Sequence, residues 1–569
     1  MELQPGMIGR FQERLINADY RKTAEAFVKL LKEGQPMPRL VQHAVDAAAP
    51  YLTVPSHVMV SPTGEFQGVN YDHCVLGLRA SRRMLPYLSK EHQMLAMSQA
   101  IWYMPQGLDI WDQLLCQFPG HYARDDKKCG QRPGGTDEQG RDRFDGPAWS
   151  APKQWFQTDH EPDREGTLDE RLRRLQVSIM EGDRQGAYKL ALGIHREPDP
   201  AARKALESQL LFCAIIDLQD TLQQRKLQNI GHKALRARAL VSLADLVGWE
   251  NAQPLLYCVV PDIACFPRLY PLYDLSTVVL GSRFKNDVYT LKRRNRLPMT
   301  DAEIDALSDT ILNGTVDQVT KHVTDLIGEG KKLIAIGDAI VAAYCRHINE
   351  EVWSRRSFFQ IGHAFDYCNV VNFWLRNYDH PHQAKAVYFQ AHFVHDCIKI
   401  TKQFKFDPNS PDYLGDPREF RTWADSLSTP RLFKELLAAI ERLDAPRAVA
   451  CTESYLARTR QRRPLMQVLA LAAAKFQNDP HIQRNAASSI EEWELTTARS
   501  HRDHILRAWT RYVSGGVKRT TALDCVLQYE QLMGLGPERS AVASTRNLEV
   551  ERGVMAMVHA KQVAALAND

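Results

Sequence analysis

The sequence predicts an all-α protein, on three observations. Apolar residues recur at spacings of three and four through most of the chain, which is the period of an amphipathic helix. The alternating β-branched runs typical of strands are almost absent. Glycine, proline and asparagine interrupt the pattern at the intervals expected of helical hairpins. At 569 residues the chain is long enough for several helical domains or for a repeated architecture.

Four segments of the chain resemble one another and indicate internal duplication. Each begins with a helical hairpin, and the hairpins are FVKLLKEGQPMPRLVQHAV, LQVSIMEGDRQGAYKLAL, LSDTILNGTVDQVTKHVTDL and LLAAIERLDAPRAVACTESYL. Each continues to a helix that we expect to open with a histidine, in VNYDHCVLGLRA, NIGHKALRARAL, QIGHAFDYCNVV and NDPHIQRNAASSI. We therefore expect four degenerate helical-hairpin units that form a curved or closed helical-repeat architecture.

The offsets within these segments, together with breaks in composition, set the expected boundaries. Gly182 precedes His232 by 50 residues and Gly314 precedes His363 by 49, whereas the outer pair is shorter, with 39 from Gly34 to His73 and 37 from Asp444 to His481. The expected divisions are helical unit 1 at 1–118, an insertion at 119–167, unit 2 at 168–300, unit 3 at 301–430, unit 4 at 431–535 and a C-terminal helical tail at 536–569. The insertion is rich in glycine, proline and charge, so it is either a lid over a site or a disordered excursion.

Composition excludes several classes of function. A formal net charge of +4 creates no field that would attract nucleic acid, and no apolar run approaches the roughly 18 residues of a membrane span. The N-terminal residues lack a secretory signal pattern, and the 11 cysteines form no CxxC pair, so we expect a cytoplasmic protein with reduced thiols. Without a GxGxxG, P-loop or GxSxG motif, neither a flavin nor a nicotinamide cofactor is expected.

The four repeated histidines are the candidate metal ligands: His73, His232, His363 and His481. Asp72 and the Asp479-Pro480 pair are good capping residues for two of the helices that carry them. Because a helix N-terminus disfavours imidazolium, a histidine there is poised as a neutral ligand or base. The alternative is that each histidine bonds a carbonyl of a neighbouring hairpin and only fixes the packing of its unit.

Further candidate catalytic residues flank the third histidine and follow it in the next helix. They are Asp366, Tyr367, His392, His395 and Asp396. In VYFQAHFVHDCIKI, two histidines three positions apart with an adjacent aspartate share one helical face with Tyr388. Such a cluster suits a divalent metal, and imidazole suits iron, zinc or copper.

Two family resemblances follow from these motifs. His363 followed by His395-Asp396 resembles the HD superfamily, in which a histidine precedes a His-Asp pair by some thirty residues, although no final aspartate is evident downstream. That resemblance implies a metal-dependent phosphohydrolase. The layout of YDHCVLGLRA, AMSQAIWYMPQ and PHIQRNAASSIEEWE resembles the questin oxidase-like family of large helical proteins. That resemblance implies an oxygen-using enzyme of aromatic ring cleavage, without a nucleotide-cofactor domain.

These observations combine into one leading expectation with two alternatives. We expect an oxygen-dependent oxidoreductase that acts on a small aromatic or apolar metabolite in a histidine-lined helical cavity. Iron is the expected metal, with a non-haem site favoured over haem, and an electron-donor protein is a conceivable partner. The alternatives are an HD-type phosphohydrolase, in which His363, His395 and Asp396 alone hold the metal, and a non-enzymatic α-solenoid scaffold.

Overall fold

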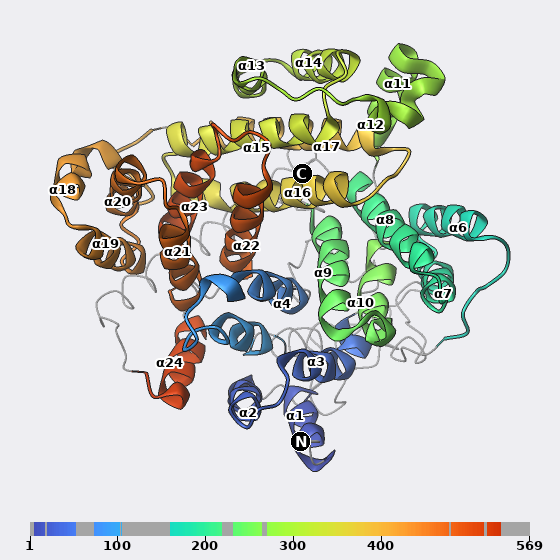
Figure 1. Cartoon of the computed structure of the whole chain (residues 1–569), viewed down its shortest axis with the longest axis horizontal. Helices are drawn as coiled ribbons and strands as arrows, with labels where there is room; N and C mark the ends of the chain where they lie inside the picture. Colours follow the sequence, from blue (N-terminus) through green and yellow to red (C-terminus); the bar gives the residue numbers. More distant parts are fainter. Residues whose placement is uncertain are drawn as a thin grey trace, which may run out of the picture. The chain divides into compact units, whose positions relative to one another are not determined.

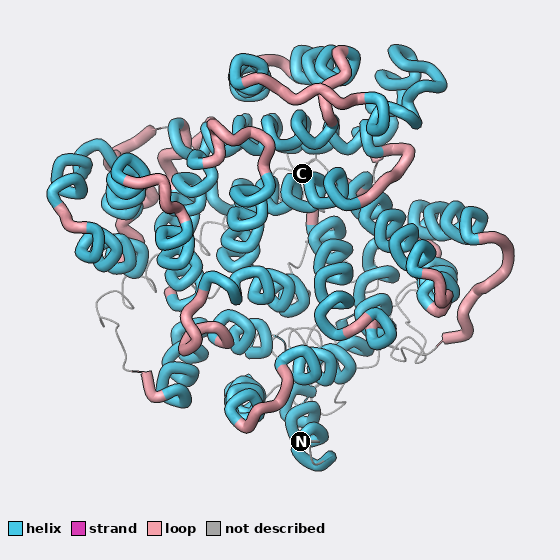
Figure 2. The backbone as a smooth tube through the Cα atoms, viewed as in Figure 1, coloured by secondary structure: helices cyan, strands magenta, loops and turns pink. Residues whose placement is uncertain are grey.

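The computed structural model of the chain is built of helices (Figure 1). It describes residues 5–16, 20–52, 73–102, 104, 160–218, 231–264, 270–404, 406–476, 480–516 and 521–535. Over these ranges the backbone forms α-helices and short 3-10 helices joined by loops, and it contains no β-strand (Figure 2). The prediction of an all-α protein is confirmed. Within the same ranges, no helix has both the length and the apolar character needed to cross a bilayer.

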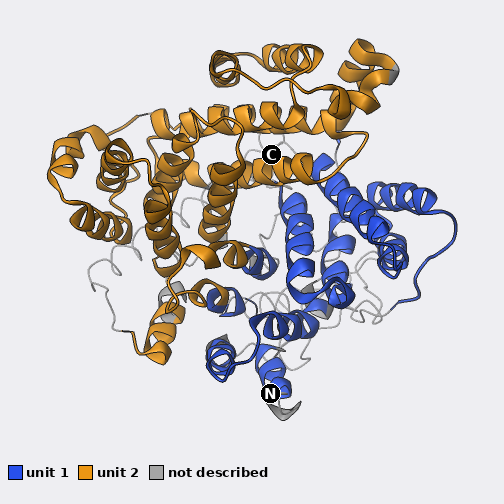
Figure 3. Cartoon of the chain, viewed as in Figure 1, with its two compact units in different colours: residues 1–79, 98–219, 226–270 blue, residues 80–97, 220–225, 271–569 orange. Residues whose placement is uncertain are grey.

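Backbone contacts divide the chain into two compact units (Figure 3). The first comprises residues 1–79, 98–219 and 226–270, and the second comprises residues 80–97, 220–225 and 271–569. The helix α4 (His73–Met84) contributes residues to both. The six sequence divisions expected above remain predictions.

The first unit consists of two groups of helices. Its N-terminal group is α1 (Pro5–Ile16), α2 (Tyr20–Lys32) and α3 (Met37–Leu52). Its second group is α6 (Leu168–Glu181), α7 (Arg184–His195), α8 (Pro200–Ile216), α9 (His232–Val247), the 3-10 turn η5 (Trp249–Asn251) and α10 (Gln253–Ile263). The two groups join where α3 packs against α9 and α10.

The second unit contains the remaining helices. It opens with η2 (Leu85–Tyr87), α11 (Pro271–Phe284), η6 (Lys285–Thr290) and α12 (Leu291–Arg294). Its third-segment helices are α13 (Asp301–Asn313), α14 (Val316–Gly328), α15 (Leu333–Glu350), η7 (Arg355–Ser357), α16 (Phe358–Asn377) and α17 (Gln383–Thr401). It ends with η8 (Pro417–Phe420), α18 (Arg421–Ser426), α19 (Thr429–Glu441), α20 (Ala445–Arg458), α21 (Arg463–Lys475), α22 (Pro480–Leu495), α23 (Asp503–Gly515) and α24 (Thr521–Met533).

Three five-helix segments pack by one scheme, namely α6–α10, α13–α17 and α19–α23. In each, the first helix contacts the second and third, the second contacts the fifth, the third contacts the fourth, and the fourth contacts the fifth. This shared pairing supports the predicted duplication of the second, third and fourth sequence segments. The first segment lies partly outside the described residues, and a curved or closed arrangement of all four units remains a prediction.

The hairpins that open these three segments form for local reasons. In each, the second helix begins at an N-cap side chain that accepts a backbone hydrogen bond from three residues further on. The caps are Asp183 of α7, Thr315 of α14 and Asp444 of α20. In the first of these turns Gly182 ends α6 at φ 83°, a left-handed conformation that glycine adopts without strain.

The prediction that each repeated histidine opens its helix is wrong for His363. That histidine is the sixth residue of α16, because η7 leads directly into the helix at Phe358. Gly362 lies inside α16 and faces α23. A Cβ on Gly362 would lie 2.9 Å from Cζ of Tyr512 and closer still to its hydroxyl oxygen. The glycine is therefore required by close packing, whereas Gly231 before α9 has φ 96° and does mark a turn.

A Gly362→Ala substitution should destabilise the protein by about 1–3 kcal/mol, because the added methyl group overpacks the contact with Tyr512. Gly281 in α11 is the matched control, since a Cβ there meets no atom within 4 Å. Gly281→Ala should raise stability by up to about 1 kcal/mol through helix propensity alone. Thermal unfolding of both variants checks this. Equal shifts of the two melting temperatures would contradict the packing role of Gly362.

Candidate metal centre

The repeated histidines occupy defined places on their helices. His73 is the first residue of α4 and His232 is the first residue of α9, while His481 is the second residue of α22. The side chain of His73 and the expected capping residues Asp72 and Asp479 lie outside what the structure describes. The role of His73 therefore remains a prediction.

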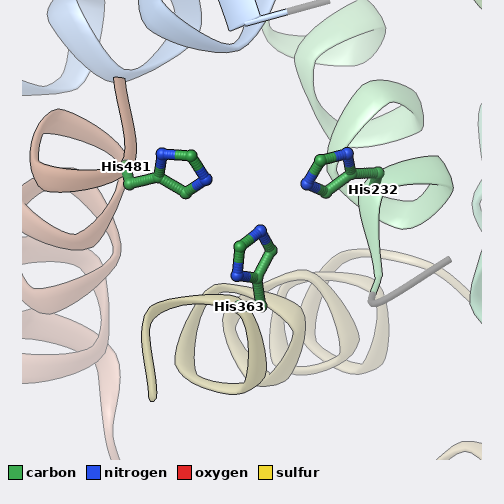
Figure 4. Close-up of side chains that lie close together, drawn as sticks. All are labelled: His232, His363 and His481. Carbon is green, nitrogen blue, oxygen red and sulfur yellow. The ribbon is translucent and has the colours of Figure 1, made fainter. Parts of the chain in front are cut away.

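Three of the four imidazoles form one group (Figure 4). His232, His363 and His481 each offer a ligand nitrogen, and these atoms all lie within 4.8 Å of one another. Figure 4 shows the three rings directed toward one another from α9, α16 and α22. His363 is 1% exposed, and the rings of His363 and His481 meet edge to face with centroids 4.9 Å apart. Within the described part of the chain, this is the only group of three side chains able to hold a metal ion.

The spacing of these nitrogens is close to that of a metal site. Imidazole nitrogens bind a first-row divalent ion at roughly 2.0–2.1 Å, so ligands in tetrahedral or octahedral positions are about 3 to 3.5 Å apart. The donor set therefore fits a borderline transition metal such as iron, zinc or copper.

The helix that carries His232 is held by two buried ion pairs inside the first unit. Lys233 of α9 pairs with Asp217, which follows α8, and Arg236 pairs with Asp262 of α10. All four side chains are less than a tenth exposed. Loss of one partner in such a pair leaves an uncompensated buried charge, so the pairs fix the start of α9 against its neighbours.

Below His363 and His481, α16 and α22 share a buried polar seam. Asp366, one helical turn after His363, accepts a hydrogen bond from Ser488 Oγ at 2.8 Å. Its other oxygen, Oδ2, lies 3.3 Å from Nε of Arg484, which is one turn after His481. Asp366 is fully buried and Arg484 is 1% exposed. These contacts join α16 to α22.

The seam continues into a network that the sequence analysis missed. Glu492 of α22 accepts hydrogen bonds from Asn369 at 2.8 Å, Asn372 at 2.9 Å and Arg376 at 3.0 Å. Arg376 also pairs with Asp338 of α15, whose pKa is raised to about 6 by burial against the lowering effect of the guanidinium. The spacing of His363, Asp366, Asn369, Asn372 and Arg376 along α16 was a readable signal of this polar face.

The candidate residues of α17 bond the hairpin α13–α14. His392 Nε2 lies 3.0 Å from Thr320 Oγ1, and His395 Nδ1 donates to the backbone oxygen of Ile311 at 2.8 Å. Tyr388 on the same face bonds Thr324. These contacts match the packing role that was considered as the alternative for the repeated histidines. Neither His395 nor Asp396 belongs to the three-histidine group.

Tyr367 is a core residue in this structure. Its ring is fully buried and packs edge to face on Phe393, with centroids 5.3 Å apart. Burial raises its pKa well above the ordinary value. Asp396 is partly exposed on α17. The predicted catalytic roles of these two residues remain untested predictions.

The buried His392 should make stability depend on pH. Its pKa is lowered to about 4, chiefly by burial and further by His395 and Lys399. The unfolded chain therefore binds the proton more readily between pH 6.5 and 4, and stability falls as the pH falls through this range. Replacing His392 by glutamine should reduce the loss of unfolding free energy between pH 6.5 and 4.5 by about 2–3 kcal/mol. Urea unfolding at the two pH values checks this, and an unchanged difference would contradict it.

Comparison of the chain with protein-family models, with curated proteins and with solved structures finds no match to any of the three.

Proposed function

We propose that the protein is a metal-dependent oxidoreductase that uses oxygen to act on a small aromatic or apolar metabolite. The observation that carries the proposal is the convergence of three imidazoles from three helices, with ligand nitrogens within 4.8 Å of one another. Three imidazole nitrogens this close together are the arrangement of a metal-ligand set.

The choice of iron rests on the donor set and on the family resemblance. Three imidazoles on one side of an ion leave positions for an exogenous ligand, which is the requirement for a catalytic site rather than a closed structural one. Iron, when bound there, would supply the one-electron and oxygen chemistry that side chains lack. His73 is proposed as a fourth ligand. A cytoplasmic location and an electron-donor protein as partner belong to the same proposal.

Contacts of α16 with α22 and α23 orient His363 and His481. His363 is held by the α16 backbone, where Gly362 packs on Tyr512, and His481 is carried by the helix that Glu492 ties to α16. Asp366 and Glu492 are fully buried and bond the facing helix, so they hold α16 and α22 together and with them the two histidines.

Metal analysis with spectroscopy tests the proposal. The purified protein, reconstituted with ferrous iron without oxygen, should retain about one equivalent of iron after desalting and bind nitric oxide with the electron paramagnetic resonance signal of a non-haem ferrous site. Zinc retained in preference to iron, with phosphatase activity, would favour the HD-type phosphohydrolase. A protein that retains no metal would overturn the proposal and leave the scaffold hypothesis.

A further inference from the structure

One helical turn beyond His363 and His481, the polar seam contains a buried arginine with unused donors. Arg484 is 1% exposed, and its Nε faces Asp366 Oδ2 at 3.3 Å. Its terminal nitrogens Nη1 and Nη2 have no hydrogen-bond partner among the described residues. Other buried arginines of the second unit differ in this respect. Both terminal nitrogens of Arg355 and of Arg511 donate to backbone carbonyls.

Unused donors at this depth are costly. A buried polar group without a partner costs about 1–3 kcal/mol, and more when the group is charged. Arg484 balances the charge of the buried Asp366 at Nε alone, which leaves the two terminal nitrogens without an acceptor among the described residues. A cost of this kind is expected where a ligand supplies the missing acceptors.

The geometry of the guanidinium identifies the acceptor. An arginine fork offers one edge formed by Nε and a terminal nitrogen, and a second edge formed by the two terminal nitrogens. Asp366 lies at Nε and is held there by Ser488, so it is not placed to bridge the second edge. Two parallel donors match the two oxygens of a carboxylate, which is the preferred partner of this edge.

The charge of the surroundings favours the same ligand. Asp366 offsets the charge of Arg484, and three neutral imidazoles add no negative charge to a divalent ion. Among these groups the net charge is positive, and an anionic ligand complements it. Residues three apart on a helix have Cβ atoms roughly 5–6 Å apart, so a small molecule can reach both Arg484 and the ion beside His481.

We propose that Arg484 binds the carboxylate of the substrate, so that the metabolite is a small organic acid with its reactive part directed toward the three histidines. This rests on the proposed function for the role of the metal, but the carboxylate contact is a property of Arg484 itself. Arg484 is thus a substrate-binding residue that sets specificity for anions over neutral molecules of the same size.

Calorimetric titration with benzoate and with benzamide, its neutral analogue of the same shape, tests the inference. The full-length protein is titrated metal-free and after loading with ferrous iron. Benzoate should bind at least about tenfold more tightly than benzamide. Arg484→Gln should weaken benzoate binding by about tenfold or more, leave benzamide binding unchanged and leave the iron content unchanged.

Two further variants keep the test decisive. Arg484→Lys retains the positive charge beside Asp366 but lacks the two parallel donors of the guanidinium, so it should also weaken benzoate binding. It serves as the test variant should Arg484→Gln fail to fold. Arg463→Gln is the control for a change of net charge, since Arg463 is exposed and lies over the Tyr87 ring, and it should bind benzoate as the wild type does.

The outcomes separate this inference from the proposed function. Benzoate binding to the metal-free protein that is lost in Arg484→Gln supports the carboxylate site even where no iron is retained. Equal affinities for benzoate and benzamide, no benzoate binding at millimolar concentration, or an unchanged affinity in a folded Arg484 variant would each overturn the inference. None of these three results bears on the iron content, which tests the metal proposal.

Discussion

Under the proposed metal site, a His363→Ala variant is expected to bind a divalent metal with an affinity lower than that of the wild type by about a hundredfold or more. His363 is the buried member of the group, and its ring touches that of His481. Its removal leaves two candidate ligands, His232 and His481, that are each partly exposed. Competition with a chromophoric chelator measures the affinity of the wild type and of the variant.

The control for this substitution is His395→Ala. His395 is as deeply buried as His363, and its Nδ1 bonds the backbone oxygen of Ile311. Its loss should lower stability and leave metal affinity unchanged. A His232→Ala variant separates the two metal hypotheses, because the three-histidine site predicts weaker binding whereas the HD-type site predicts no change. A metal affinity that falls in His395→Ala and is unchanged in His232→Ala would contradict the proposed site.

An Arg376→Met variant is expected to be destabilised by about 3–5 kcal/mol, which is the usual cost of removing one partner from a buried ion pair. Arg376 is the cation that both Asp338 and Glu492 contact, and those two carboxyl groups are 1% and 0% exposed. Without the guanidinium, the buried carboxylates of Asp338 and Glu492 would repel each other, and no positive charge would balance them. Chemical unfolding at neutral pH measures the loss of unfolding free energy.

The pH dependence of the variant provides an internal check. The pKa of Asp338 is already raised to about 6 by burial, and loss of Arg376 should raise it further. The folded variant then binds the proton more tightly than the unfolded chain, so its stability should rise as the pH falls from 7 toward 5. Arg346→Met is the matched control, since Arg346 makes surface pairs with Asp309 and Glu350 worth about 1 kcal/mol or less. A similar loss in both variants would contradict a special role for the buried network.

The helical elements were predictable because their causes are local. The apolar period of three and four, the cap at Thr315 and the glycine at Gly182 act within a few residues of the chain. The repeated histidines were visible as recurring positions, and the polar face of α16 was partly visible in His363 and Asp366. His363 was misplaced at a helix start, because the packing of Gly362 against Tyr512 within α16 cannot be deduced from neighbouring residues.

By itself the sequence determined the fold class and the helical hairpins, because hydrophobic period and capping depend on neighbouring residues. It also showed that four histidines recur at similar positions. Only the tertiary structure decided which histidines belong together. It joined His363 to His481 across 118 positions of sequence and bonded His392 to α14 and His395 to α13. It also exposed Arg484 as a buried cation with unused donors. The physical reason is that the spacing of residues in the sequence shows which of them share one face of a helix. Which other helix contacts that face depends on how helices distant in sequence pack.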